Sequence, residues 1–149
     1  MVTGAAYYQT ILETLCSSIE ALDVTGYRDQ STAAGRWKRA RRATTDAGIT
    51  EDLGFWVDLG AHATFEKSLV TYSAGVVFAI RYRPDQDISD QARLHAALRA
   101  LEEHLQGAGY DVPGGMRTVP KGAQISRPPA GDAWLQVDLS FTLILPRGA

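Results

Sequence analysis

The sequence has few of the residues that form redox and metal sites. Its single cysteine, Cys16, excludes an internal disulfide. Cys16 borders the apolar stripe of a predicted helix and lies in no protease or redox motif, so we interpret it as a buried or half-buried structural thiol. The three histidines, His62, His95 and His104, belong to no HExxH or CxxC motif. We therefore expect solvated surface histidines and no bound metal.

Motifs of nucleotide binding and acyl transfer are also absent from the sequence. Its glycines match neither GxGxxG nor GxxxxGK[ST], and there is no GxSxG turn. Asp85, Asp87 and Asp90 lie close together but lack the spacing and terminal glutamate of a calcium loop. Helix capping and the helix dipole explain these carboxylates. The sequence thus predicts a protein that is not an enzyme and needs no cofactor.

Long apolar runs are missing as well. No run approaches the roughly 20 residues that cross a bilayer. The stretch from Met1 to Gln9 has neither the basic region nor the apolar core of a signal peptide. We expect a protein that folds and acts in aqueous compartments. At 149 residues the chain can bury one core unaided, so we predict a single domain over 1–149.

Two stretches have the apolar period of amphipathic helices. The first covers about residues 5–23, and its apolar stripe is Tyr8, Ile11, Leu12, Leu15, Ile19 and Leu22. The second begins near Asp87 or Ser89, either of which can cap it, and ends at Gly107 or Gly109. Its stripe is Leu94, Ala97, Leu98, Leu101 and Leu105, and its exposed face carries Arg93, Arg99, Glu102 and Glu103.

Three stretches alternate apolar and polar residues, as half-buried strands do. The apolar face of the first is Phe55, Val57, Leu59, Ala61, Ala63 and Phe65. That of the second is Val70, Tyr72, Ala74, Val76, Phe78, Ile80 and Tyr82. That of the third is Leu135, Val137, Leu139, Phe141, Leu143 and Leu145, opposite Gln136, Asp138, Ser140 and Thr142. The second and third are longer than the usual five or six residues.

The remaining segments are predicted loops. Residues 27–53 form a long basic loop, in which Ala33–Ala43 admits a short helical turn. Residues 110–133 are rich in proline and glycine and indicate a loop or arm, with a short edge strand near Met116–Val119. The order of elements predicts an α+β two-layer sandwich. Two helices pack on one face of a mainly antiparallel sheet, and the long strands project as a hairpin.

The basic segment of the long loop is the most distinctive feature. Arg36, Trp37, Lys38, Arg39, Arg41 and Arg42 lie within seven residues. Of the 15 basic residues five lie here, which leaves 10 against 17 acidic residues elsewhere. The segment is a candidate for nucleic-acid contact, with Trp37 stacked on a base. Docking on an acidic patch of a neighbouring subunit, or a solvated loop, is the favoured interpretation, because the rest of the chain is acidic.

This layout resembles that of tail terminator and related neck (head–tail joining) proteins of long-tailed bacteriophages. The matching features are the first helix (Tyr8–Leu22), the paired strands (Phe55–Tyr82), the helix after the Arg83-Pro84-Asp85 turn, and the last strand from Trp134. The basic segment and the 110–133 stretch have no match in that pattern. The resemblance implies a homohexameric ring that caps the tail tube and contacts the tube protein and the head connector. It also implies DNA in the channel and a virion protein assembled in the host bacterial cytoplasm.

Three other functions fit the same sequence. One is a homo-oligomeric domain that binds a small ligand between helices and sheet. Another is a different neck or tail completion protein of a phage. The third is a small enzyme that uses Asp58, His62 and Glu66 on one strand face.

Overall fold

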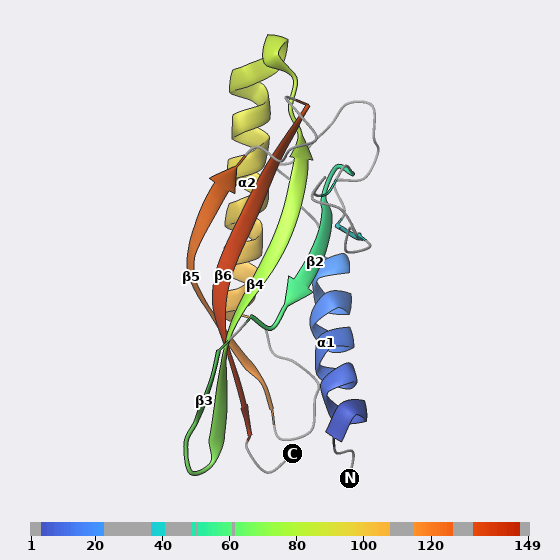
Figure 1. The fold of residues 1–149 in the computed structure, drawn as a ribbon. Coiled ribbons are helices and arrows are strands. Elements are labelled where there is room, and N and C mark those ends of the chain that lie inside the picture. Colours follow the sequence, from blue (N-terminus) through green and yellow to red (C-terminus); the bar gives the residue numbers. More distant parts are fainter. Residues whose placement is uncertain are drawn as a thin grey trace.

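The computed structural model describes residues 4–22, 37–40, 49, 51–60, 62–107, 115–126 and 133–146 (Figure 1). Its elements in chain order are α1 (Gly4–Glu20), β1 (Lys38–Arg39), β2 (Gly54–Asp58), β3 (Ala63–Phe65), β4 (Leu69–Arg81), the 3-10 turn η1 (Pro84–Gln86), α2 (Asp87–Gly107), β5 (Arg117–Ser126) and β6 (Trp134–Pro146). Both predicted helices and the two long predicted strands are therefore present.

The described strands form one six-stranded sheet in the order β1-β2-β4-β6-β5, with β3 paired to β4. Only β1 and β2 run parallel, and the other pairs are antiparallel. The two central strands, β4 and β6, have 13 residues each and pair along their whole length. Their strict alternation holds this register, because a slip of one residue would turn every apolar side chain to the wrong face.

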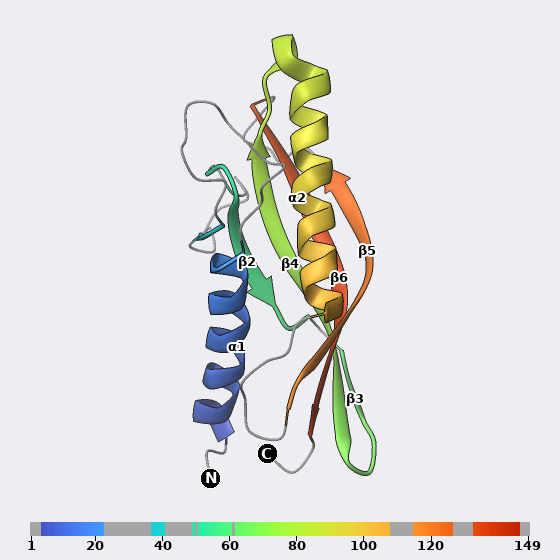
Figure 2. The ribbon, with the colours of Figure 1, turned by 180° about the vertical axis from the view of Figure 1, so that it is seen from behind.

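Both helices cover the same face of the sheet, which lies in front of them in Figure 1 and behind them in Figure 2. Helix α1 contacts β1 and β2, whereas α2 contacts β4 and β5. The two helices bury one stripe each, consisting of Tyr7, Ile11, Leu15 and Ile19 on α1 and Leu94, Ala97, Leu101 and Leu105 on α2. Both stripes join alternate residues of β4 and β6 in one apolar core. The predicted α+β sandwich is confirmed.

One detail of the α1 stripe differs from the prediction. The fully buried tyrosine is Tyr7, and Tyr8 is half-buried. The Tyr8 ring packs edge-on against that of Tyr72 on β4, with 6.3 Å between their centroids. The buried residues Tyr7, Ile11, Leu15 and Ile19 are four residues apart, so the buried stripe begins one residue earlier than predicted.

The first predicted strand is interrupted, which corrects the expectation of one strand over 55–66. Asp58 pairs with Gly75 and Ala63 with Tyr72, so this chain has two more residues than β4 between the same two pairs. Gly60 makes the detour feasible, because its φ of 75° suits glycine and a Cβ there would lie 1.8 Å from the Ser73 carbonyl oxygen.

The strand β3 and the adjoining part of β4 continue past the C-terminal end of α2 (Figures 1 and 2). Phe65, expected to be half-buried, is therefore 66% exposed. The long strands were predicted to project as a hairpin, and β4 does so, but its partner in this hairpin is the short strand β3.

The edge strand β5 is longer than the four residues predicted for it. It has ten residues, and a bulge separates Pro120 from Gly122. Proline fits here because an edge strand needs no hydrogen bond on its outer side. Because of residues such as Pro120 and Gly122, this stretch was interpreted as a loop, although it contains a ten-residue strand.

The sheet face away from the helices is partly covered near the start of β2. Ile49 is 3% exposed, and its backbone N–H donates to Gln136 Oε1 at 3.4 Å. Gly54 makes room for it, since a Cβ on Gly54 would lie 2.8 Å from Ile49 Cγ2. This glycine therefore has a packing role.

Candidate assembly surfaces

Trp37 of the basic segment belongs to the core. It is 2% exposed, and its ring lies edge-on to Phe55 and Phe78, with centroids 6.2 and 4.8 Å away. Stacking on a nucleic-acid base would require an exposed ring. The expectation of a base-stacking Trp37 is therefore wrong, and this residue instead anchors the segment to the sheet.

The strand β1 holds Lys38 and Arg39 beside β2, which also corrects the option of a helical turn at these two residues. Arg39 bonds to three side chains of α1: Glu13 at 2.8 Å, Ser17 at 3.0 Å and Glu20. The hydrogen bond that Arg39 donates to Glu13 raises the pKa of Arg39, burial opposes this rise, and Glu20 adds to it. The acidic surface that Arg39 meets thus lies on its own chain.

The other basic residues of the segment divide into two groups. Lys38 lies 3.9 Å from Glu51, and both side chains are about half exposed or more, so this ion pair stabilises the fold by little. Arg36, Arg41 and Arg42 lie outside the described residues. The structure therefore leaves their predicted contact with DNA or a neighbouring subunit as a prediction.

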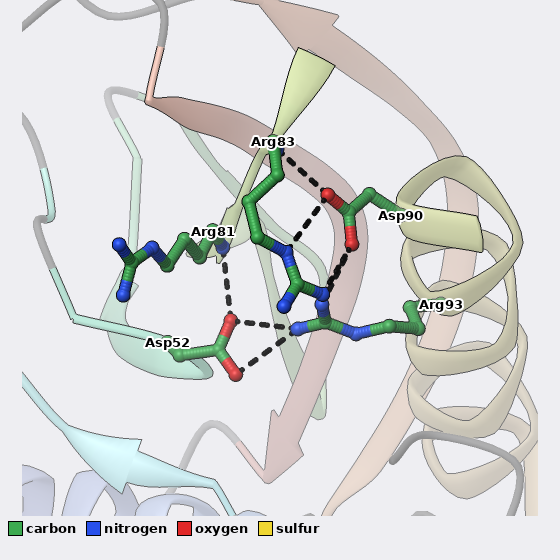
Figure 3. Close-up of polar contacts among 5 residues, drawn as sticks. All are labelled: Asp52, Arg81, Arg83, Asp90 and Arg93. Carbon is green, nitrogen blue, oxygen red and sulfur yellow. Dashed lines mark hydrogen bonds and ion pairs between the residues drawn. The ribbon is translucent and has the colours of Figure 1, made fainter. Parts of the chain in front are cut away.

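A buried ion cluster joins the start of β2, the end of β4 and the first turns of α2 (Figure 3). The Asp90 carboxylate is 0% exposed and accepts hydrogen bonds from Arg83 at 2.9 Å and Arg93 at 2.7 Å. Arg93 also binds Asp52 at 3.2 Å, and Asp52 accepts the Arg81 backbone N–H at 2.9 Å. Figure 3 shows the Arg81 side chain directed away from these groups.

Two predictions about α2 are wrong at this cluster. Arg93 was expected on the exposed face but is 5% exposed. Asp90 was expected to act through helix capping and the dipole, whereas its oxygens bind arginine side chains and the Arg83 backbone N–H at 2.7 Å. Burial alone would raise the pKa of Asp90, but the hydrogen bonds and charge of Arg83, with the charge of Arg93, lower it. The cluster therefore connects the first turns of α2 to the start of β2 and the end of β4.

The histidines are placed unequally. His62 and His95 are exposed, as predicted. His104 is half-buried, which corrects the prediction of a solvated side chain, and its Nε2 lies 3.0 Å from Ser18 Oγ on α1. The Ser18 hydroxyl donates to the Leu15 carbonyl at 2.7 Å, so His104 Nε2 is the donor to Ser18. Burial lowers the pKa of His104.

Cys16 is half-buried, as its position beside the α1 stripe predicted. Burial raises the pKa of its thiol, Arg39 opposes this rise, and Glu13 and Glu20 add to it. A raised pKa keeps the thiol protonated at neutral pH, which lowers its reactivity as a nucleophile.

The three polar residues of the enzyme alternative do not share a continuous strand face. Asp58 ends β2 and accepts the Gly60 backbone N–H at 3.0 Å, and the strand resumes only at Ala63. The structure instead brings Asp58 near Asp138 of β6, a proximity that sequence reasoning missed because it depends on strand order. Burial, and then the charge of Asp58, raises the pKa of Asp138. Within the described ranges, no three His, Cys, Asp or Glu side chains gather as a metal site would require.

Exposed apolar side chains gather at two parts of the sheet. Phe65 (66%) and Leu69 (38%) lie on the projecting hairpin, whereas Val119 (40%) and Ile125 (53%) lie on β5. In the described part of the chain, β5 forms one edge of the sheet and β3 the opposite edge of its projecting end. Both edges present backbone groups that another strand could pair with.

Two clefts follow the boundary between α2 and β5, which we call the α2–β5 groove. One, of about 350 Å³, is lined by Leu98, Glu102, Gln106, Pro120, Lys121, Gly122, Ala123 and Leu139. The other, of about 370 Å³, is lined by Tyr82, Asp87, Gln91, Leu94, His95, Ile125 and Leu135. A third cleft, of about 450 Å³, lies between α1 and β2.

No protein-family model matches this chain, and no curated protein matches it either. Among the helices that the structure describes, none is long and apolar enough to span a membrane. The function must therefore be inferred from the fold and its surfaces.

Proposed function

We propose that this protein is a structural subunit that assembles into a closed ring of six copies. In this proposal the ring caps a phage-type tail tube, as in the tail terminators that the sequence resembles, and joins the tube to the head connector. The observation that carries the proposal is the projecting hairpin. The 13-residue strand β4 carries it beyond α2, with Phe65 and Leu69 exposed on it.

The exposed hairpin favours association, because moving its apolar side chains out of water lowers the free energy. Burying a Phe or Leu side chain is worth about 1.5–3 kcal/mol. The described sheet also offers unlike edge strands, β5 on one side and β3 on the opposite side of its projecting end. A contact between unlike surfaces is heterologous, and repeated rotation of such a contact either closes a ring or builds a filament. Ring closure leaves neither surface exposed.

The basic segment supports an assembly or DNA role only in part. Arg39 is held by α1, and Trp37 is in the core. In this proposal the charge that meets a DNA channel or a neighbouring subunit is that of Lys38 and of Arg36, Arg41 and Arg42, the last three of which lie outside the described residues. A ring with DNA in its channel would present these charges inward.

Light scattering combined with negative-stain electron microscopy tests the ring. We expect a mass near six times the 16.2 kDa of one chain, and annular particles with a central opening. The measurement should be repeated with tail tubes assembled from the tube protein of the same genome, where rings should sit at one tube end. A chain that stays monomeric both alone and with tubes would overturn the proposal. Rings found at another position of the particle would favour a different neck or tail completion protein.

A second candidate function is small-ligand binding, which the cleft between α1 and β2 favours. Its volume of about 450 Å³ is within the usual range of ligand pockets. Leu12, Cys16, Phe55 and Val57 line it together with the charged Arg39 and Asp58. A ligand that binds the native state would raise the melting temperature. Substituting Leu12→Trp should fill the cleft and abolish that rise without changing the ring.

A further inference from the structure

The projecting hairpin and the α2–β5 groove are unlike surfaces of the molecule. The hairpin ends in Phe65, the most exposed aromatic residue of the described chain. The groove contains apolar side chains, among them Leu98 and Leu139, beside the small residue Ala123. A large side chain at position 123 would fill this hollow, so Ala123 leaves space at an open edge of the sheet.

Strand pairing would place the Phe65 side chain on the correct side of the sheet. Phe65 pairs with Val70, which belongs to the buried, helix-covered face of β4. Ala123 pairs with Leu139, which belongs to the same face of β6. Side chains of paired residues share a face, and sheet extension continues that face from one strand to the next. A β3 strand added beside β5 would thus direct Phe65 under α2.

The edge of β5 is open along only part of its length. Pro120 lacks an N–H, a bulge follows it, and Lys121 places a charge on the edge. These three features are those by which edge strands avoid unspecific pairing. They leave Gly122–Ser126, a five-residue segment, free of such obstacles. A short strand such as β3, with three residues, fits that length.

Charges on the two surfaces are complementary. The tip of the hairpin has one acidic and one basic residue in succession, Glu66 and Lys67. The groove also has one of each, Glu102 on α2 and Lys121 on β5. Each surface thus has one charge of each sign, and opposite charges can pair at the rim around a buried Phe65. A second copy of this chain is the partner that these features fit.

We propose that β3 of one copy pairs with Gly122–Ser126 of the next copy, and that Phe65 fills the hollow between α2 and β5. This contact deepens the proposed ring, on which it rests for closure, because it names the interface that repeats around it. Each copy uses its hairpin on one side and its groove on the other. The sheet thus becomes continuous from subunit to subunit.

Substitution of the exposed aromatic residue tests the contact. Phe65→Asp should raise the dissociation constant of the assembly at least about 30-fold, as expected for a central interface residue. Ile88→Asp is the matched control, since Ile88 is an apolar residue of α2 that is 85% exposed and lines neither cleft of the groove. Both variants should keep the wild-type melting temperature within a few degrees. Assembly that persists in Phe65→Asp would overturn the contact.

Cross-linking separates the contact from the ring. In a Cys16→Ser background, chains carrying Phe65→Cys are mixed with chains carrying Ala123→Cys and oxidised. We expect disulfide-linked heterodimers in at least tenfold excess over mixtures of Phe65→Cys with Ile88→Cys. Rings without this cross-link would overturn the contact and leave the proposed function intact. Cross-linked dimers or filaments without rings would support the contact and overturn the ring. Neither cross-links nor rings would overturn both.

Discussion

At the scale of single residues, the buried ion cluster is a place where one substitution should have a large effect on stability. Asp90 is fully buried and holds two arginines, Arg83 and Arg93. Such a pair need not stabilise the fold more than apolar residues would, because desolvation of the charges is costly. Removing one partner is different, since it leaves the other charge buried and uncompensated. The cluster thus fixes how α2 meets β4.

Replacing Asp90 should therefore destabilise the protein strongly. We expect Asp90→Ala to lower the free energy of unfolding by about 3–5 kcal/mol, because Arg93 loses its nearest carboxylate and the Arg83 backbone N–H loses its acceptor. Urea denaturation measures this change. Arg99→Ala is the control, since Arg99 is 60% exposed and its pairs with Glu102 and Glu103 lie on the surface. Its effect should stay below about 0.5 kcal/mol. Equal effects of the two substitutions would contradict the role of the cluster.

His104 makes stability depend on pH in a specific window. Burial lowers the pKa of His104, so the unfolded chain binds this proton at a higher pH than the folded protein does. Stability that is present above the unfolded pKa of about 6.5 should be lost as pH falls toward the folded pKa. Urea denaturation at pH 7.5 and pH 5.5 measures the loss, and His104→Gln should reduce it. The exposed His95 on the same helix is the control, and His95→Gln should leave the pH dependence unchanged.

Trp37 and Arg39 show why single residues of the basic segment were misjudged. Their partners, Phe78 on β4 and Glu13 on α1, are distant in sequence. Composition identified the segment as unusual, but composition carries no information about such contacts. Only the pairing of β1 with β2 brings Arg39 to the helix. The position of the basic segment could be predicted from composition, whereas the contacts of its residues depend on the tertiary structure.

At the scale of elements, periodicity predicted those that have one buried face. The alternation of Leu135–Leu145 and the stripes of both helices have direct counterparts in β6, α1 and α2. Periodicity failed at residues 59–62. The two extra residues there preserve the alternation of apolar and polar residues, so the pattern does not show that the strand is interrupted. Periodicity also missed most of β5, where Pro120 and Gly122 indicate a loop but an edge strand tolerates them. Edge strands and interrupted strands depend on which strands are neighbours in the sheet, and periodicity carries no information about strand order.

The detour between β2 and β3 gives a prediction at the same scale. Gly60→Ala should destabilise the protein by about 1–3 kcal/mol, because the positive φ disfavours a side chain and the new Cβ would clash with the Ser73 carbonyl. Thermal and urea unfolding measure the effect. Gly122→Ala is the control, since a Cβ there has no atom within 4 Å. A neutral Gly60→Ala would mean that the detour can rearrange without cost.

At the scale of the whole molecule, charge and apolar surface are separated. The exposed apolar residues of the described sheet lie along the hairpin and β5, and the buried ion cluster lies at the other end of β4. Within the basic segment, Arg39 adjoins α1, whose Glu13 and Glu20 neutralise it. Assembly through the sheet edges and attraction through the basic segment are therefore separable, and different substitutions can test them.

The remaining charges of the segment should act in assembly or on DNA. We predict that the triple substitution Arg36→Gln, Arg41→Gln and Arg42→Gln weakens ring formation, with a loss that grows at low salt, where attraction is least screened. The control is the triple substitution Arg81→Gln, Arg99→Gln and Arg117→Gln, which removes equal charge from exposed positions elsewhere. Sedimentation at several salt concentrations measures the association.

DNA contact has a separate signature in the same variants. The logarithm of DNA affinity should fall linearly with the logarithm of salt concentration, and each lost phosphate contact should reduce that slope by about 0.9. A gel shift over a salt series measures it for the wild type and both triple variants. Salt-sensitive rings that retain no DNA would assign the segment to a neighbouring subunit, whereas a reduced slope would assign it to the channel. If the triple substitution changed neither quantity, the segment would be a solvated loop, and the ring would depend on its sheet edges alone.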